Sequence, residues 1–200
     1  MNLGTDKGPD KAATTLQRLK GLIQRLPKKL LILILLLIAY YFCLPKQLFR
    51  TPHATVVESR SGKLLGALIA EDGQWRFPVV DSVPSKFETC ILNFEDAHFY
   101  WHPGFNPISI GKAFLANILA GKTVRGGSTL TQQVIRLSRN HKKRTYWEKV
   151  RELVLATRLE LGYSKKYILK LYASHAPFGG NVVGLEAAAW RYFGMQPNQL

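Results

Sequence analysis

Two glutamates of this chain, Glu95 and Glu152, have neighbours that suit acid–base chemistry. Glu95 precedes Asp96 in a stretch rich in apolar and aromatic residues, and Glu152 follows Lys149 at a spacing that puts both on one face of a helix. In a group transfer, one carboxylate takes a proton from the attacking hydroxyl while other groups stabilise the leaving group. Taken singly, each acid is explained equally well by an ordinary ion pair.

The segment between the two glutamates contains groups that bind anions. It combines glycines, hydroxyls, amides and one cation, namely Gly126, Gly127, Ser128, Thr129, Gln132, Gln133 and Arg136. Glycines before a helix capped by Ser or Thr leave backbone N–H groups free for a phosphate. A plain loop-to-helix junction would show the same glycines. In combination with the two acids, however, the segment indicates a sugar transfer from a pyrophosphate.

Other polar residues are less specific. A basic cluster near the two acids suits a solvated patch, a surface facing lipid headgroups or a substrate contact. Its members are Arg125, Arg139, Lys142, Lys143 and Arg144. The histidines do not show the spacing of metal ligands, so the sequence predicts no metal site. His102 stands before Pro103-Gly104 and is expected to organise a loop.

Mostly helices must position these groups. Apolar periodicity and capping residues predict helices over 85–99, 107–119, 128–139, 146–161, 164–172 and 185–192. Segment 107–119 is apolar and bears one charge, Lys112, which suits either the core or a bilayer surface. In the helix over 146–161, the apolar stripe Trp147, Val150, Val154 and Thr157 is expected on the buried side, away from Lys149 and Glu152.

A β-rich region precedes the helices. Short runs over 55–59, 64–70 and 75–80, separated by Ser-Gly and Asp-Gly turns, predict a hairpin or a three-stranded piece. We expect four parts along the chain: a basic tail over 1–29, a membrane anchor over 30–49, a β-rich linker over 50–83 and a helical domain over 84–200. The expected fold class is therefore mainly α.

The anchor is predicted from the uncharged apolar run Leu30 to Leu44, which follows Lys28-Lys29. A cleaved signal peptide would have an apolar run of this length, but the aromatic residues at its far end and the lack of a small-x-small site favour an uncleaved anchor. The basic tail is then cytoplasmic and the domain lies on the outer side. With a net charge of +15 the chain attracts polyanions. The anchor favours lipid and a pyrophosphate over nucleic acid, which is not an expected partner.

Taken in order, these segments resemble the peptidoglycan glycosyltransferases, glycosyltransferase family 51, which form the transglycosylase domain of class A penicillin-binding proteins. The likeness covers about 56–200 and is nearest to the 1C type. Its motifs are Glu95-Asp96 with Phe99, His102 and Gly104; Gly126 to Gln133; Lys149-x-x-Glu152; Ile168 to Tyr172; and Gly184 to Ala189 with Tyr192-Phe-Gly194.

The resemblance implies polymerisation of lipid II into β-1,4-linked glycan strands, with release of undecaprenyl pyrophosphate, in bacterial cell-wall synthesis. Glu95 would deprotonate the acceptor hydroxyl, and Glu152 would assist the leaving group, either directly or through a divalent cation, Mg²⁺ or Mn²⁺. The substrate-binding residues would be Asp96, Phe99, Gly126, Gly127, Ser128, Thr129, Gln132, Gln133, Arg136 and Lys149.

A lysozyme-like helical fold is also implied, with a small membrane-associated jaw lobe that segment 107–119 fits. The implied partners are lipid II, the growing glycan, the membrane and other cell-wall synthesis proteins. The implied location is the inner membrane, with a single span, a cytoplasmic N-terminus and a periplasmic domain.

The chain departs from the family at Ala173-Ser174, where Leu-Asn is usual, and at Met195, where Lys is usual. No penicillin-binding serine motif with its partner motifs is present, so transpeptidation is not expected of these residues. Because the family's domain continues beyond Leu200, a second hypothesis is a truncated, catalytically idle remnant that binds membrane or cell-wall machinery. A third is a lysozyme-like hydrolase that uses the same acids with water as nucleophile.

Overall fold

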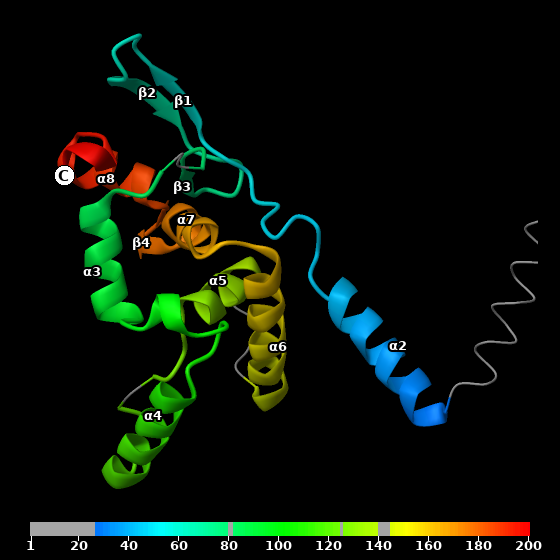
Figure 1. The fold of residues 1–200 in the computed structure, drawn as a ribbon. Coiled ribbons are helices and arrows are strands. Elements are labelled where there is room, and N and C mark those ends of the chain that lie inside the picture. The colour runs from blue at the N-terminus through cyan, green and yellow to red at the C-terminus, as the bar shows by residue number, and fades with distance from the viewer. Residues whose placement is uncertain (1–26, 80–81, 125, 140–144) are drawn as a thin grey trace, which may run out of the picture. The chain divides into compact units, whose positions relative to one another are not determined.

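The structure is a computed structural model that describes residues 27–79, 82–124, 126–139 and 145–200. The chain forms two compact units, Met1–Cys43 and Leu44–Leu200 (Figure 1). Most of the expected basic tail, and the basic residues Arg125 and 142–144, lie outside the described residues. The structural account therefore rests on one helix of the first unit and on nearly all of the second.

Helix α2 (Lys28–Phe42) is the described part of the first unit and corresponds to the predicted anchor. None of its residues is buried. Its 15 residues rise about 22 Å at 1.5 Å per residue. In the described parts of the chain, no helix combines the length and the apolar character that a bilayer crossing requires.

The range predicted for the anchor, 30–49, includes residues of the second unit. Leu44, Leu48 and Phe49 belong to the second unit, where they are partly buried against its main core. The ring of Phe49 stacks on that of His175, with centroids 3.6 Å apart. Apolar residues that we expected to lengthen a membrane span are therefore part of the folded domain.

Helices make up most of the second unit, as the sequence predicted. They are α3 (Ser85–Glu95), α4 (Pro107–Ala120), α5 (Leu130–Ser138), α6 (Tyr146–Gly162), α7 (Lys165–His175) and α8 (Leu185–Phe193), with two 3₁₀ turns, η1 (Phe99–Trp101) and η2 (Pro197–Gln199). Thr129 and Ser164 cap α5 and α7 by accepting the backbone N–H three residues on, and so do Asn106 and Thr145 in α4 and α6.

Two helix ends differ from the prediction. Helix α3 ends at Glu95 rather than Phe99, because Asp96 leaves the helical region with φ −160° and ψ 74°. Helix α7 continues past Tyr172 to His175. Its last turn is short of apolar residues, but tertiary packing buries it: Ala173 is fully buried. Local periodicity does not contain that information.

The β-structure also differs. Strands β1 (Thr55–Glu58) and β2 (Leu64–Leu68) form the predicted antiparallel hairpin. Strand β3 (Trp75–Arg76) does not join it, but pairs in parallel with β5 (Val182–Val183), which pairs antiparallel with β4 (Pro177–Gly179). For this last region the sequence predicted only a break between helices. Strands β4 and β5 are too short to be predicted from local sequence patterns alone.

The main core lies between α5, α6 and α7, with η1 beside them (Figure 1). Leu130, Val134 and Ile135 of α5 are fully buried. They pack with Ala156 and Leu159 of α6 and with Ile168 and Leu169 of α7, among others. Burying each such aliphatic side chain contributes about 1.5–3 kcal/mol. Helix α5, which carries Gln132, Gln133 and Arg136 of the predicted anion-binding residues, is thus packed firmly into the core.

The buried side of α6 was predicted wrongly. Trp147 and Val150 are 79% and 51% exposed, whereas the buried residues of this helix are Glu152, Ala156 and Leu159. Glu152 is therefore no surface residue, as a solvated ion pair would require. Its burial is the first structural sign that this carboxylate has a specific task.

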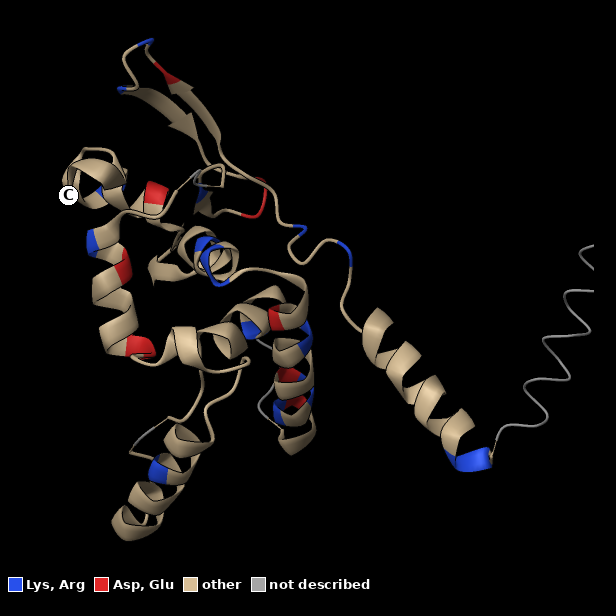
Figure 2. Cartoon of the chain, viewed as in Figure 1, with Lys and Arg blue, Asp and Glu red and all other residues tan. Residues whose placement is uncertain are grey.

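Segment 107–119, for which the sequence allowed a place in the core or on a bilayer surface, forms helix α4, and its exposure distinguishes the two. Only Ala113 is buried, while Ile108, Phe114, Ile118 and Leu119 are each more than half exposed. The helix lies apart from α7 and α8 and bears a single basic residue, Lys112 (Figures 1 and 2). It is therefore not a core helix of this unit, and its apolar surface is open.

Candidate active site

A cavity of about 740 Å³ is lined by the end of α3, the loop after it, the start of α4 and the loop before α5. Its polar groups include Glu95, Lys112 and Ser128, which come from three different segments. Phe94 and Trp101 also line it and are 86% and 88% exposed. The Glu95 carboxylate, the Lys112 ammonium and open aromatic surface are thus available to a ligand in the cavity.

Glu95 is the last residue of α3, and its carboxylate lies against α5. Its Oε2 accepts a hydrogen bond of 2.6 Å from the side-chain amide of Gln133. A single neutral donor orients the carboxylate without neutralising it. Glu95 therefore keeps capacity to accept a further proton or hydrogen bond from a ligand in the cavity.

Asp96, predicted to bind substrate, has its carboxylate committed inside the fold. It is buried and bonds the His102 ring at 2.9 Å through Nε2, while the N–H of Leu130 donates to it at 2.9 Å. His102 Nδ1 accepts the Gly104 N–H, so Nε2 carries the proton donated to Asp96. This confirms the loop-organising role of His102. Asp96 positions the site, and a substrate contact of its own remains a prediction.

The start of α5 is less open to anions than the sequence suggested. The N–H of Leu130 is bound by Asp96, and the N–H of Gln132 by the Thr129 hydroxyl at 3.2 Å. Two of the backbone donors expected to be free at this helix start are therefore already bonded. An anion here would be held mainly by side chains.

Two glycines allow close packing around the cavity. A Cβ on Gly127 would lie 2.9 Å from Ile110 Cα, and one on Gly104, where φ is +91°, would lie 2.8 Å from the Ala156 backbone. A side chain at either position would push a neighbouring helix away. Gly126 has open space around it. Of the adjacent glycines Gly126 and Gly127, only Gly127 is required by the packing of its neighbours.

Lys149 connects the second acid to the cavity. Its ammonium donates to Ser128 Oγ at 2.8 Å, to Gln132 Oε1 at 3.1 Å and to Glu152 Oε2 at 3.2 Å. Its side chain is 46% exposed, whereas that of Glu152 is 8% exposed. The ammonium thus joins the nearly buried Glu152 carboxylate to the partly exposed Ser128.

Gln132 and Gln133 each form a hydrogen bond in the surroundings of one of the two acids. Gln133 bonds Glu95, and Gln132 bonds Lys149 in the group that contains Glu152. Consecutive residues of a helix point about 100° apart, so one turn of α5 connects both groups. Gln132 is fully buried, and its Nε2 has no hydrogen-bond partner among the described residues.

Arg136 and the first acid, Glu95, act on the same tyrosine. Burial, and to a lesser extent the Glu95 carboxylate, raise the pKa of Tyr172 to about 12, against the opposing effect of Arg136. Both charges therefore act on the same phenol, which belongs to α7. Arg139, one turn further along, pairs with Glu148 instead.

Phe99, the remaining predicted binding residue, lies in the core with 1% of its surface exposed. A substrate contact would require its ring to leave the core. Six of the predicted site residues line the cavity: Glu95, Asp96, Gly126, Gly127, Ser128 and Thr129. Glu152 is joined to Ser128 through Lys149. Lys112 and Trp101 of the cavity wall were not predicted, because neither belongs to a motif.

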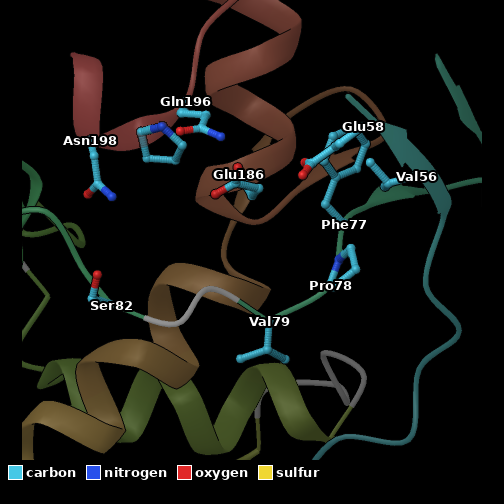
Figure 3. A pocket seen from close by; sticks show the side chains of 10 residues that line it. Val56, Glu58, Phe77, Pro78, Val79, Ser82, Glu186, Gln196 and Asn198 are labelled. Atoms are coloured by element: carbon cyan, nitrogen blue, oxygen red, sulfur yellow. The ribbon is translucent and has the colours of Figure 1, made fainter. Parts of the chain in front are cut away.

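A second cavity, of about 400 Å³, is lined by β1, the segment after β3, α8 and η2 (Figure 3). Glu58 and Glu186 both point into it (Figure 3). Burial raises the pKa of the Glu186 carboxyl above its ordinary value, and the Glu58 carboxylate adds to the rise. None of the predicted site residues, all of which the structure describes, lines this cavity. The candidate active site is therefore the cavity that contains Glu95.

Comparison with known proteins gives a consistent result. A family model described as Transglycosylase matches residues 61–200. The chain is 41% identical over 157 residues to penicillin-binding protein 1C of Escherichia coli (strain K12), covering 78% of this chain and 20% of that protein. It is 42% identical over 120 residues to the biosynthetic peptidoglycan transglycosylase of Alcanivorax borkumensis, covering 60% and 49%. The chain thus spans about a fifth to a half of the length of these relatives.

Proposed function

This chain belongs to the transglycosylase family, and on that premise we propose that it is a peptidoglycan glycosyltransferase which polymerises lipid II into β-1,4-linked glycan. The observation that supports this most is the position of Glu95, in the wall of a large cavity with its carboxylate oriented by Gln133. A buried second acid, Glu152, is joined to the same cavity through Lys149 and Ser128. This placement of the two acids supports a transfer between sugars.

Glu95 acts as the general base in this proposal. The acceptor hydroxyl donates its proton to Glu95 as its oxygen attacks the anomeric carbon of the donor sugar, whose configuration is inverted. The bond from Gln133 limits rotation of the carboxylate, so a free oxygen can face the acceptor. General-base catalysis of this kind contributes about 10²–10⁴ in rate.

The leaving pyrophosphate carries the developing negative charge, and we assign its stabilisation to side chains. Lys149 has a half-exposed side chain and bonds Ser128 of the cavity wall, and Arg136 acts on the same tyrosine, Tyr172, as Glu95. Charge-assisted hydrogen bonds from such groups are about twice as strong as neutral ones. Glu152 would keep Lys149 in position and so assist the departure of the pyrophosphate.

We propose that no divalent cation binds to the polar group formed by Ser128, Gln132, Lys149 and Glu152. The three oxygens that could bind one, from Ser128, Gln132 and Glu152, all accept bonds from Lys149. A lysine ammonium has three donors, so these acceptors satisfy it fully. A divalent cation bound to the same oxygens would lie close to the ammonium, which repels it. Lys149 is therefore proposed to supply the positive charge here.

A membrane location is part of the proposal. Helix α2 is apolar with no buried residue, and α4 exposes several large apolar side chains on a helix with one charge. We propose that α2 anchors the chain in the inner membrane, with snorkelling by Lys28 and Lys29 because about 22 Å falls short of a hydrocarbon core of about 30 Å. The domain would lie on the outer side, with α4 as the jaw lobe of a lysozyme-like fold that contacts the bilayer.

The test is incubation of the purified chain, solubilised in detergent, with labelled lipid II, followed by separation of polymer from monomer. Polymer whose chains are digested by a muramidase supports the proposal. Unchanged lipid II would favour the idle remnant, and release of free disaccharide without polymer would favour the hydrolase. A variant lacking Glu95, as specified in the Discussion, controls for contaminating enzymes.

A further inference from the structure

Lys165 occupies a position that is unfavourable for a lysine. It is the first residue of α7, where a positive charge faces the positive end of the helix dipole. Its side chain is only 19% exposed, so the ammonium also loses part of its hydration. The next residue, Lys166, is exposed. A residue that breaks a local rule in this way is commonly held by a specific requirement elsewhere in the fold.

The contacts of Lys165 join three helices to one loop. Its Nζ donates to Glu160 Oε1 of α6 at 2.8 Å and to the backbone oxygen of His102 at 2.7 Å, and lies 4.5 Å from the centre of the Phe99 ring. Glu160 Oε1 also accepts from the Thr131 hydroxyl of α5 at 2.5 Å, and its side chain is 7% exposed. Each of these contacts is largely shielded from solvent and is therefore stronger than a surface pair.

His102 transmits this contact to the active site. Lys165 holds its carbonyl, while its ring bonds Asp96, the residue that follows Glu95 and binds the first N–H of α5. The loop between α3 and α4 is thus fixed at one residue from two sides. Lys165 itself does not line the cavity.

We propose that Lys165 is a positioning residue: its hydrogen bond to the His102 carbonyl fixes the loop over 96–104 and thereby the place of the Glu95 carboxylate. This rests on the proposed function, because it concerns the same reaction. Glu160 serves to neutralise Lys165, whereas the bond to His102 carries the effect on catalysis. A misplacement of about 1 Å lowers turnover by about 10²-fold, so a loop held loosely would be costly.

The experiment separates stability from positioning with four variants of the full chain in detergent: Lys165→Met, Lys165→Arg, the double variant Glu160→Gln/Lys165→Met, and Lys166→Met as matched control. For each, kcat and KM for lipid II and the Tm are measured. We expect Lys165→Met to lower both Tm, because Glu160 is left without its cation, and kcat, by about 10- to 100-fold with KM within about twofold. Lys165→Arg should recover most of the kcat, and Lys166→Met should match the wild type.

The double variant decides the question even if Lys165→Met fails to fold. It leaves no buried unpaired charge, so its Tm should recover, yet its kcat should stay low because the His102 carbonyl still lacks a donor. A double variant with recovered Tm and near-normal kcat would show that Lys165 contributes stability alone. A wild-type chain that forms no polymer would overturn the proposed function, and this inference with it.

Discussion

The side-chain amide of Gln133 donates a hydrogen bond of 2.6 Å to the Glu95 carboxylate, joining the first turn of α5 to the last residue of α3. Replacing Gln133 by Met keeps the volume but removes the donor. Hydrogen bonds to charged groups contribute about 1.5–3 kcal/mol, so kcat should fall about 10- to 100-fold. Steady-state polymerisation of lipid II measures this. Gln47→Met, at an exposed glutamine, is the control, and an unchanged kcat in Gln133→Met would remove the orienting role.

The Lys149–Glu152 pair predicts a difference between its single and double variants. Lys149→Met leaves the nearly buried Glu152 carboxylate without its cation and should lower the free energy of unfolding by about 1–3 kcal/mol. Lys149→Met/Glu152→Gln should recover most of that loss. Chemical denaturation of the wild type and the two variants measures it, and equal losses in the single and double variants would contradict the predicted coupling.

Gly126 and Gly127 should differ in stability when each is replaced by Ala. A Cβ at Gly127 meets the α4 backbone at Ile110, whereas none of the surrounding atoms lies within 4 Å of one at Gly126. We expect Gly127→Ala to lose about 1–3 kcal/mol, in the range of overpacking, and Gly126→Ala to stay within about 0.5 kcal/mol. The free energies of unfolding, determined side by side, test this. Similar free energies of unfolding for both variants would mean that α4 can shift to accommodate the new Cβ without loss of stability.

His175 predicts a pH dependence of stability. Burial lowers its pKa to about 4, helped by the charges of His53 and Arg76 and despite its backbone hydrogen bond. Below pH 6.5 the His175 imidazole binds a proton in the unfolded chain, whereas in the folded chain it does so only near pH 4. Stability is therefore lost as the pH falls through this window. The full loss is roughly 3 kcal/mol. His175→Phe keeps a ring to stack on Phe49 and removes the titration.

The measurement is the stability difference between wild type and His175→Phe at pH 7 and at pH 4, which cancels the titration of other groups. It should shift in favour of the variant by roughly 3 kcal/mol at the lower pH. A difference independent of pH would mean that the imidazole is not buried as described.

Local signals in the sequence predicted much of the helical fold. The caps Thr129 and Ser164 and the apolar spacing of α5 lie within a few residues of one another, so the helix starts could be located. The parallel pairing of β3 with β5 joins Trp75 to Val182. No local sequence pattern identifies a partner so far away in the chain, so strands β4 and β5 were not predicted.

The sequence predicted candidate site residues but not the contacts between them. Glu95 and Glu152 were identified through their motifs, yet the buried side of α6 was assigned to Trp147 and Val150 because a charged residue normally faces solvent. The structure buries Glu152 instead, with Lys149 as its compensating cation. Lys165 was not singled out either, since its partners lie on other elements and in the loop at His102.

The central claim is that Glu95 is the base of a lipid II polymerase, and Glu95→Gln tests it most directly. The amide keeps the size of the side chain but cannot take a proton at neutral pH. Wild type and variant, purified identically and matched in Tm, are incubated with labelled lipid II, and the polymer formed per enzyme is measured over time. The account predicts a loss of about 10²- to 10⁴-fold in the variant. Polymer formation by Glu95→Gln at the wild-type rate would contradict it.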